Sequence, residues 1–454
     1  MLLWGLWLAL SPATLWGQPV ALFEEQAVSV EALGARAQQR WQVLQRLPMA
    51  VRLQVVRLPE ELWRYRTFTL SVNAAGRLVA GRGQGLYRLT ARRGALSVLS
   101  EEAVAWNGRL YMGADTTVVG EVSLVVLRTG SVTGHVLVGD REYWVRPLGG
   151  GLHALVEIDP RKYPRERPVS PYHDGGGGFR GAGVNNGVGL ERSEQAVVQA
   201  REALVVGGGV REGASVSRVV GQDRCSPEVV RVLVLYTPSA AQGRDIDGLI
   251  HAAINDANQA YRNSAINNLE LRLAHKQLFS FTVETNPEDD VRRLANDPQA
   301  QALRDQYQAD VVVLLIDDNE GSDGWSTAAG VAGVIPHGSS GEAVVNVSEV
   351  RQKAYAIVKV SYAGAGRYTL AHEIGHIQGA QHHPDDPIDP QGIPYARGHR
   401  FVAPVLRCIS DLPYGYRCFQ EYTYNATIMA YTPWPYVRIR YFSSPGVMYN
   451  GVFT

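Results

Sequence analysis

This chain of 454 residues has no net charge, and it contains few lysines, few cysteines and few long apolar runs. Its 44 basic and 44 acidic residues cancel to a formal net charge of zero, so charge favours neither a nucleic acid nor an anionic membrane as partner. After the first residues, no stretch approaches about 18 uninterrupted apolar residues, the length of a membrane-spanning helix. The sequence thus predicts a mature protein that is soluble, and it leaves the oligomeric state open.

The N-terminus is the exception to this shortage of apolar runs. Residues 1–17 combine an apolar run through Leu10 with small residues around Ala13 and Gly17, which is typical of a secretory signal peptide. The run lacks an early Lys or Arg, and a membrane anchor is the alternative, but the run is short for a bilayer. We therefore expect a secreted, extracellular protein.

Only three cysteines are present. Cys408 and Cys418 are ten residues apart and bracket a turn-rich segment, so we expect a disulfide that closes a short loop. A disulfide agrees with export to an oxidising compartment. Cys225 has no partner in this scheme.

The N-terminal part of the chain predicts a β-rich domain over residues 18–173. Apolar spacing over residues 26–47 suits one or two helices. Beyond them, short alternating runs follow between turn residues, as at 66–72, 120–127 and 134–139. Alternation with a period of two indicates antiparallel strands. No constellation of catalytic type occurs in this part.

Glycine dominates part of the next segment, residues 174–224, which contains four consecutive glycines at 175–178. Such a composition does not form a packed core and predicts a flexible linker that a processing protease can cut. A phosphate-binding loop is the alternative, but the segment lacks a preceding apolar strand and a Gly-Lys-Ser/Thr ending.

The remaining residues, 225–454, predict an α/β domain. Apolar strands and amphipathic helices alternate along its first part, at 230–237, 246–261, 269–274, 288–308 and 310–316. This order of elements implies a mostly parallel sheet with helices packed on it.

A metal-binding pattern follows in this domain, H-E-x-x-H-x-x-G-x-x-H, formed by His372, Glu373, His376, Gly379 and His382. Residues four apart share one face of a helix, so His372 and His376 can direct two imidazoles at one point. Gly379 permits a left-handed helix end, after which the chain can return His382 as a third ligand. Three nitrogen ligands and one open position are typical of a catalytic zinc site.

The same helix has a core side. Leu370, Ile374 and Ile377 repeat on the face opposite the histidines, while Glu373 lies about 100° round the helix from His372. From there the Glu373 carboxylate can reach a metal-bound water as a general base without being a ligand. The alternative is a chance pattern on an amphipathic helix with ordinary buried histidines.

This motif resembles that of the metzincin zinc endopeptidases, whose second signature is a methionine turn below the metal. The segment Thr427-Ile428-Met429-Ala430-Tyr431 lies where the resemblance places this turn. Met429 would then be the floor of the site and Tyr431 a residue that stabilises the developing oxyanion. The alternatives are a core methionine and an ordinary buried tyrosine.

More of the chain is similar to reprolysin-like metzincins, in particular the bacterial peptidyl-Asp metalloendopeptidases. The similarity includes Val232-Leu233-Val234-Leu235-Tyr236-Thr237-Pro238 and Arg440-Tyr441-Phe442-Ser443-Ser444-Pro445, and a weaker one covers the β-rich part. It implies a metzincin-type catalytic domain after a pro-domain, and a zymogen. It also implies that residues 330–336 form the sheet edge that pairs with substrate, the alternative being an internal strand.

Three features differ from the family pattern or stay open. His383 follows the third histidine and could compete with it as a ligand. Asp385, Asp386 and Asp389 form either a solvated acidic turn or a contact to the site or to Ca²⁺. Cys225 is either an unpaired or intermolecularly paired cysteine or a latency switch, because a thiolate can occupy the open zinc position.

The sequence therefore predicts a secreted zinc-dependent endopeptidase that acts on proteins or peptides, with Zn²⁺ on His372, His376 and His382. Glu373 is the expected general base and Tyr431 a second catalytic residue. A secreted binding or adhesion protein with a structural zinc, and a zinc amidase acting on non-protein amides, are the alternatives.

Overall fold

The computed structural model describes residues 20–163 except 82–84 and 113–117, and residues 228–454 except 322–324, 327, 334–346, 387–395 and 411–415. By internal contacts, all of these described residues belong to one compact unit. The predicted signal peptide, the whole predicted linker and Cys225 lie outside the described residues. Within the described part, no helix is both long and apolar enough to cross a membrane.

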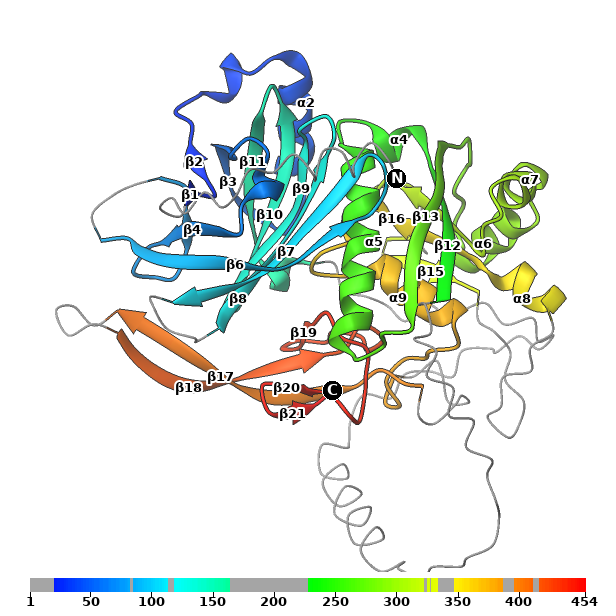
Figure 1. The fold of residues 1–454 in the computed structure, drawn as a ribbon. Coiled ribbons are helices and arrows are strands. Elements are labelled where there is room, and N and C mark those ends of the chain that lie inside the picture. The colour runs from blue at the N-terminus through cyan, green and yellow to red at the C-terminus, as the bar shows by residue number, and fades with distance from the viewer. Residues whose placement is uncertain are drawn as a thin grey trace, which may run out of the picture. The chain divides into compact units, whose positions relative to one another are not determined.

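The N-terminal part is built on one large sheet (Figure 1). In sheet order its strands are β1 (Val20–Ala21), β4 (Thr67–Val72), β6 (Tyr87–Val98), β7 (Ala103–Met112), β8 (Val118–Leu127), β9 (Val132–Val138), β10 (Arg141–Gly149), β11 (Leu152–Ile158), β3 (Ala50–Arg57) and β2 (Glu24–Glu25), and β5 (Leu78–Val79) pairs with β4. All pairs are antiparallel except β1 with β4. A β-rich N-terminal part is thus present.

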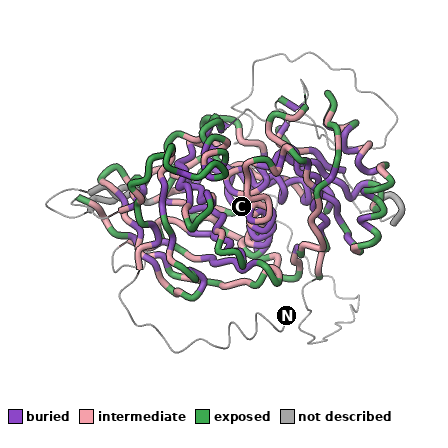
Figure 2. The backbone as a smooth tube through the Cα atoms, turned by 90° about the horizontal axis from the view of Figure 1, so that it is seen from above, coloured by how far each residue is buried: buried purple, intermediate pink, exposed green. Residues whose placement is uncertain are grey.

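Short helices accompany this sheet. They are α2 (Ala35–Gln45) and the 3-10 turns η1 (Val30–Ala32), η2 (Leu62–Arg64) and η3 (Pro160–Lys162). Helix α2 buries Trp41 and Leu44 in a core that also contains Trp144 of β10. The buried residues lie within the packed elements, as the purple segments of Figure 2 show.

The C-terminal part opens with a five-stranded sheet in the order β13-β12-β14-β16-β15. The strands are β12 (Glu228–Tyr236), β13 (Leu269–Leu278), β14 (Val311–Ile316), β15 (Gly330–Ala332) and β16 (Tyr355–Lys359). Strands β12, β13, β14 and β16 pair in parallel, and β15 is antiparallel to β16 at the end of the sheet order.

Helices cover both faces of this sheet. Successive residues of a strand point to opposite sides, so alternate residues of one strand pack against different helices. Val232, Val234 and Val313 pack with α5 (Ile246–Asn263) and α9 (Thr369–Ile377). Leu233, Leu235 and the alternate residues of β14 pack instead with α6 (Pro287–Ala295) and α7 (Pro298–Gln306). Two short helices, α4 (Pro238–Ala241) and α8 (Val347–Lys353), and the 3-10 turn η4 (Val360–Tyr362) complete this region.

After α9 the chain forms smaller sheets. Strands β17 (Arg400–Ser410), β18 (Tyr416–Ala426) and β19 (Val437–Arg438) make one, and β20 (Met448–Tyr449) and β21 (Val452–Phe453) make another. The β17–β18 register makes Cys408 and Cys418 direct cross-strand partners. The side chains of both cysteines lie outside the description, so the disulfide stays a prediction.

A buried polar contact joins the β-rich part to α5. Asn107 of β7 donates to Asn255 of α5 at 3.1 Å, and Asn255 donates to Ser123 of β8 at 3.0 Å. Arg440 binds both Asp256 of α5 at 2.9 Å and Glu121 of β8 at 2.8 Å. Sequence periodicity alone would have placed Asn255 and Asp256 on a solvent face, yet they are 0% and 2% exposed.

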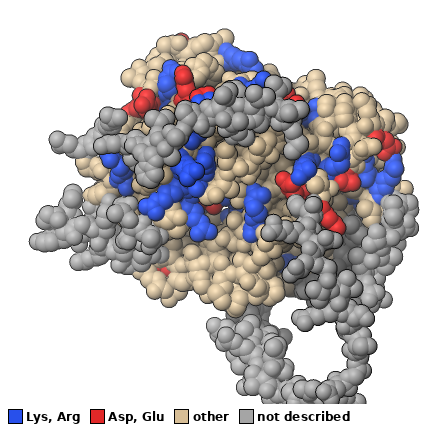
Figure 3. Space-filling view, viewed as in Figure 1, with Lys and Arg blue, Asp and Glu red and all other residues tan. Residues whose placement is uncertain are grey.

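Charge is unevenly distributed although it cancels over the chain. Figure 3 shows Lys and Arg side chains gathered on one face. In the β-rich part, the exposed Arg92 and Arg109 are direct cross-strand partners on β6 and β7. Like charges in opposite positions destabilise a sheet, but Arg109 also lies opposite Glu121 of β8, and the Arg92 guanidinium lies over the Tyr111 ring at 4.6 Å.

Candidate metal centre

Helix α9 carries the metal-binding pattern. Its core side is formed by Leu370, Ile374 and Ile377, which are 0%, 0% and 4% exposed. His372 and His376, one turn apart, are also buried, at 5% and 2%. Since the apolar side is fixed in the core beneath β12 and β14, the direction of the two imidazoles is fixed as well.

The helix ends at the predicted glycine. Gly379 has a φ of 92°, in the left-handed region. The amide of Ala380 donates to the carbonyl of Gly375 at 2.8 Å, which closes the last turn. The reversed chain then places His382, 1% exposed, beside the two helical histidines.

The three imidazoles converge on one point. Their Nε2 atoms are 3.1 Å apart for His372 and His376, 2.9 Å for His376 and His382, and 3.3 Å for His372 and His382. A tetrahedral zinc ion with bonds of about 2.0–2.1 Å separates its ligand nitrogens by about 3.3 Å, so this donor set fits zinc. No other such group of potential ligands occurs among the described residues.

Backbone carbonyls orient two of these rings. Nδ1 of His372 donates to the Ile428 carbonyl at 2.7 Å, and Nδ1 of His376 donates to the Ala380 carbonyl at 2.8 Å. A carbonyl can only accept, so each Nε2 is left with its lone pair directed inward. Nδ1 of His382 is buried and has no hydrogen-bond partner in the described part of the chain.

The surroundings keep the rings uncharged. Burial, the neighbouring His376 and the charge of Arg438 hold the pKa of His372 well below its usual range. Burial, His376, Arg438 and Arg397 act in the same direction on the pKa of His382. Neutral imidazole is the form that binds a metal.

Met429 of the predicted methionine turn packs against the metal-binding helix. It is 1% exposed and belongs to the same core as α9. A Cβ on Gly375 would lie 2.6 Å from the Met429 sulfur, so glycine allows the helix to rest on this floor. Ile428, whose carbonyl orients His372, is the preceding residue.

Tyr431 lies close to two of the histidines. Its ring centroid is 4.4 Å from that of His382 and 6.2 Å from that of His372. The tyrosine is half-buried. It is therefore a neighbour of the ligands, while its role in catalysis stays a prediction.

His383 does not join the cluster. Its Nδ1 faces the Arg400 guanidinium at 2.9 Å and the Asp385 amide at 3.2 Å. Asp386 forms an ion pair with Arg400 at 3.1 Å, and the Asp385 side chain is 78% exposed. Asp389 lies outside the described residues, and the remaining acidic residues give no support to a calcium site.

Arg438 is a buried residue of this region that the sequence analysis did not single out. Its guanidinium donates to the Arg367 carbonyl at 2.7 Å and to the Ala430 carbonyl at 3.0 Å. It thereby ties the segment before α9 to the methionine turn. The one signal in the sequence was the alternation of arginine with apolar residues at positions 437–440.

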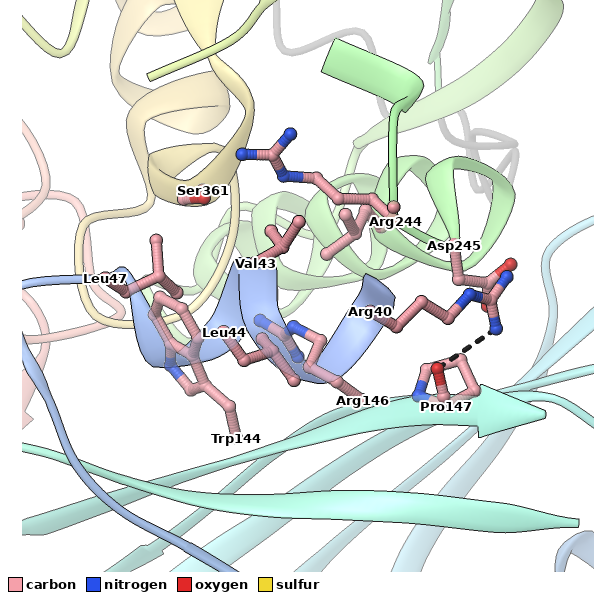
Figure 4. A pocket seen from close by; sticks show the side chains of 12 residues that line it. Arg40, Val43, Leu44, Leu47, Trp144, Arg146, Pro147, Arg244, Asp245 and Ser361 are labelled. Atoms are coloured by element: carbon pink, nitrogen blue, oxygen red, sulfur yellow. Dashed lines mark hydrogen bonds between the residues drawn. The ribbon is translucent and has the colours of Figure 1, made fainter. Parts of the chain in front are cut away.

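A small cavity lies away from the histidines (Figure 4). It has a volume of about 30 Å³ and is lined by residues that include Arg40, Leu44, Trp144, Arg146, Arg244 and Asp245. Arg40 donates to the Pro147 carbonyl at 3.0 Å across its wall. The space suits one or two water molecules and is too small for a peptide.

These features define a class of protein, because a zinc-type histidine triad on a helix, with a buried glutamate beside it, belongs to zinc metallopeptidases. Comparison narrows this class. Residues 226–443 match Reprolysin_5, metallo-peptidase family M12. This region is therefore a metzincin-like zinc metalloendopeptidase domain.

Curated relatives agree with this assignment. The chain is 29% identical over 383 residues to the peptidyl-Asp metalloendopeptidase of Xanthomonas campestris pv. campestris, covering 80% of this chain and 73% of the relative. It is 28% identical to that of Stenotrophomonas maltophilia, with 80% and 75% covered. The Pseudomonas aeruginosa enzyme of the same name is 37% identical over 170 residues, 36% of this chain and 27% of that one.

A solved structure is also similar, though weakly. Metalloproteinase-II from Bacteroides fragilis aligns with a TM-score of 0.38 and 12% identity, over 71% of this chain and 83% of that one. The assignment does not depend on it. The family match and the curated relatives favour a peptidase over the binding-protein and amidase alternatives.

Proposed function

We propose that this protein is a secreted zinc endopeptidase, made as a zymogen, in which Glu373 is the general base. The observation that carries the proposal is the convergence of three Nε2 atoms within 2.9–3.3 Å, two of them on the helix that also holds Glu373. When bound, zinc supplies a Lewis acid for the peptide carbonyl and a water of lowered pKa.

Glu373 has the placement that a general base needs. It is 4% exposed, follows His372 directly on α9, and is not among the three residues whose ligand atoms converge. In the proposed reaction this carboxylate takes a proton from the attacking water and later gives it to the leaving amine. Tyr431, adjacent to His382, donates a hydrogen bond to the developing oxyanion.

The proposed substrate is an extended peptide. Strand β15 ends the order of the catalytic sheet, and Gly330 at its start lies against Glu373. A peptide that adds to this edge as a further strand would bring its scissile carbonyl next to the metal site.

We propose a preference for bonds next to aspartyl residues, in line with the names of the relatives. Positive charge near the metal ligands supports this preference. Arg438 and Arg397 both act electrostatically on His382, and no acidic side chain is among the groups that shift the pKa of this ring. Arg438 is buried and bonded to two carbonyls, so its charge would attract a bound aspartyl side chain at a distance and not by direct contact.

The contact between the β-rich part and α5 supports a zymogen. Asn255, Asp256 and their polar partners lie in it beside a small apolar cluster that includes Ala252 of α5 and Ala105 of β7, and interfaces with such a polar share are typical of parts that can separate. After cleavage of the linking segment, the face of α5 that now packs on the sheet would expose groups that water can solvate.

Incubation with a mixture of denatured proteins tests this function. With zinc-loaded protein whose linking segment has been cleaved, we expect new peptide termini next to aspartyl residues by mass spectrometry, and none in the presence of a zinc chelator. A matched pair of peptides that differ only in Asp or Asn measures the preference. Absence of new termini would contradict the peptidase, whereas termini without an aspartyl preference would contradict only the proposed substrate.

A further inference from the structure

Gly330 lies at the start of β15, opposite Val358 of β16. Its φ is outside the left-handed region, so the backbone at this position does not require glycine. A strand interior also disfavours glycine, because glycine has no side chain to pack there. The residue type at 330 therefore needs another explanation.

The explanation lies in what a side chain would meet. A Cβ on Gly330 would lie 2.6 Å from Oε1 of Glu373, 2.9 Å from its Cγ and 2.8 Å from Cγ2 of Thr369. All three distances are shorter than real Cβ contacts, which essentially never fall under 3.0 Å. Glycine is thus the residue that leaves space for the Glu373 side chain and for Thr369 one turn before it.

The rest of the helix is less able to yield than the glutamate. Leu370 and Ile374, the neighbours of Thr369 and Glu373, are fully buried in the core. Thr369 is β-branched, so its χ1 angle is restricted. The Glu373 side chain has more rotatable bonds, and a methyl group at position 330 would displace its carboxylate first.

We propose that Gly330 is a positioning residue of the peptidase: its missing side chain holds open the place in which the Glu373 carboxylate lies. This inference rests on the proposed role of Glu373 as general base. Gly330 belongs to β15, the strand proposed to pair with the substrate, and it also leaves space for the Glu373 carboxylate, the group proposed to move the proton.

Gly330→Ala tests the proposal, with Gly446→Ala as the matched control. Gly446 is exposed, and a Cβ there would meet no heavy atom within 4 Å. For Gly330→Ala we expect one zinc per chain, a melting temperature close to that of the wild type, and kcat lower by about 10- to 100-fold with KM changed by less than about threefold, since small misplacements of a reacting group have effects of this size. The acid limb of the kcat/KM profile should also shift, because this limb reports the general base. Gly446→Ala should match the wild type in all five quantities.

A second variant shows which atoms are responsible. Thr369→Ser removes the methyl group that lies 2.8 Å from the new Cβ. In the Gly330→Ala background it should restore part of kcat, because the added methyl group can then move away from Glu373. The single variant Thr369→Ser should bind zinc as the wild type does.

Two results would overturn the proposal. The first is a Gly330→Ala protein with wild-type kcat and pH profile. The second is loss of zinc or of folding in Gly330→Ala, because the backbone and not the glutamate would then have yielded. Failure of the peptidase function itself is distinguishable, since the wild type would then show no zinc-dependent turnover at all.

Discussion

Nδ1 of His372 donates a hydrogen bond of 2.7 Å to the carbonyl oxygen of Ile428, the residue before Met429. This bond joins the metal-binding helix to the methionine turn, 56 residues further along the chain. The floor of the site therefore contributes more than apolar packing, because its backbone also sets the tautomer and orientation of a ligand.

Shortening the floor side chain should loosen this arrangement. Met429 is 1% exposed, so Met429→Ala leaves a cavity and should lower the free energy of unfolding by about 2–5 kcal/mol. Met429→Leu conserves volume and should cost less than about 1.5 kcal/mol. Denaturant unfolding gives the free energy of unfolding of both variants, and metal titration gives their zinc affinity. Equal losses of unfolding free energy in Met429→Ala and Met429→Leu would argue against an effect of side-chain volume.

Substitution of His382 and of the adjacent His383 should have very different effects on zinc binding. His382 lies in the cluster of Nε2 atoms, whereas His383 contacts Arg400 and Asp385. His382→Ala should therefore lose stoichiometric zinc and reduce turnover by at least about 100-fold, while His383→Ala keeps both. Metal analysis and peptide hydrolysis provide the measurement. Loss of zinc in His383→Ala with retention in His382→Ala would reverse the ligand assignment.

The contact of the β-rich part should weaken in acid. Burial alone would raise the pKa of Glu121, but the charges of Arg440 and His135 outweigh it and lower the pKa from 4.5 to about 2. The unfolded chain thus takes up this proton at higher pH than the folded one. The stabilisation is complete above pH 4.5 and is lost as the pH falls toward 2.

The wild type should therefore lose up to about 3 kcal/mol between pH 5 and pH 2 through this group. Urea unfolding of the wild type and of Glu121→Gln at both pH values isolates the contribution of Glu121. Both proteins lose metal in acid, so the difference between their unfolding free energies does not include that loss. Glu60→Gln, at an exposed position of the same part, is the control. A difference between wild type and Glu121→Gln that stays constant with pH would contradict the role of the Glu121–Arg440 pair.

Local features of the site could be predicted because they depend on short stretches of chain. Leu370, Ile374 and Ile377 are buried on one side of α9, as their spacing indicates. The φ of 92° at Gly379 follows from the residue type and its position after the helix. The pattern that predicts the three ligands is contained in the eleven residues 372–382.

Other features depend on sheet order and on contacts between distant segments. Gly330 and Glu373 are 43 residues apart, and their proximity arises because β15 lies at the end of the sheet next to α9. Asn255 and Asp256 look solvent-exposed in the sequence, but strands more than 130 residues earlier bury them. Periodicity describes one element at a time and has no access to such pairings.

Metal content and turnover of a Glu373→Gln protein together test the central claim most directly. The substitution keeps the size of the side chain and the three histidines but removes the proton acceptor. We predict one zinc per chain, wild-type unfolding and a turnover lower by about 10²- to 10⁴-fold. Near-wild-type turnover by zinc-loaded Glu373→Gln would contradict this account of the site.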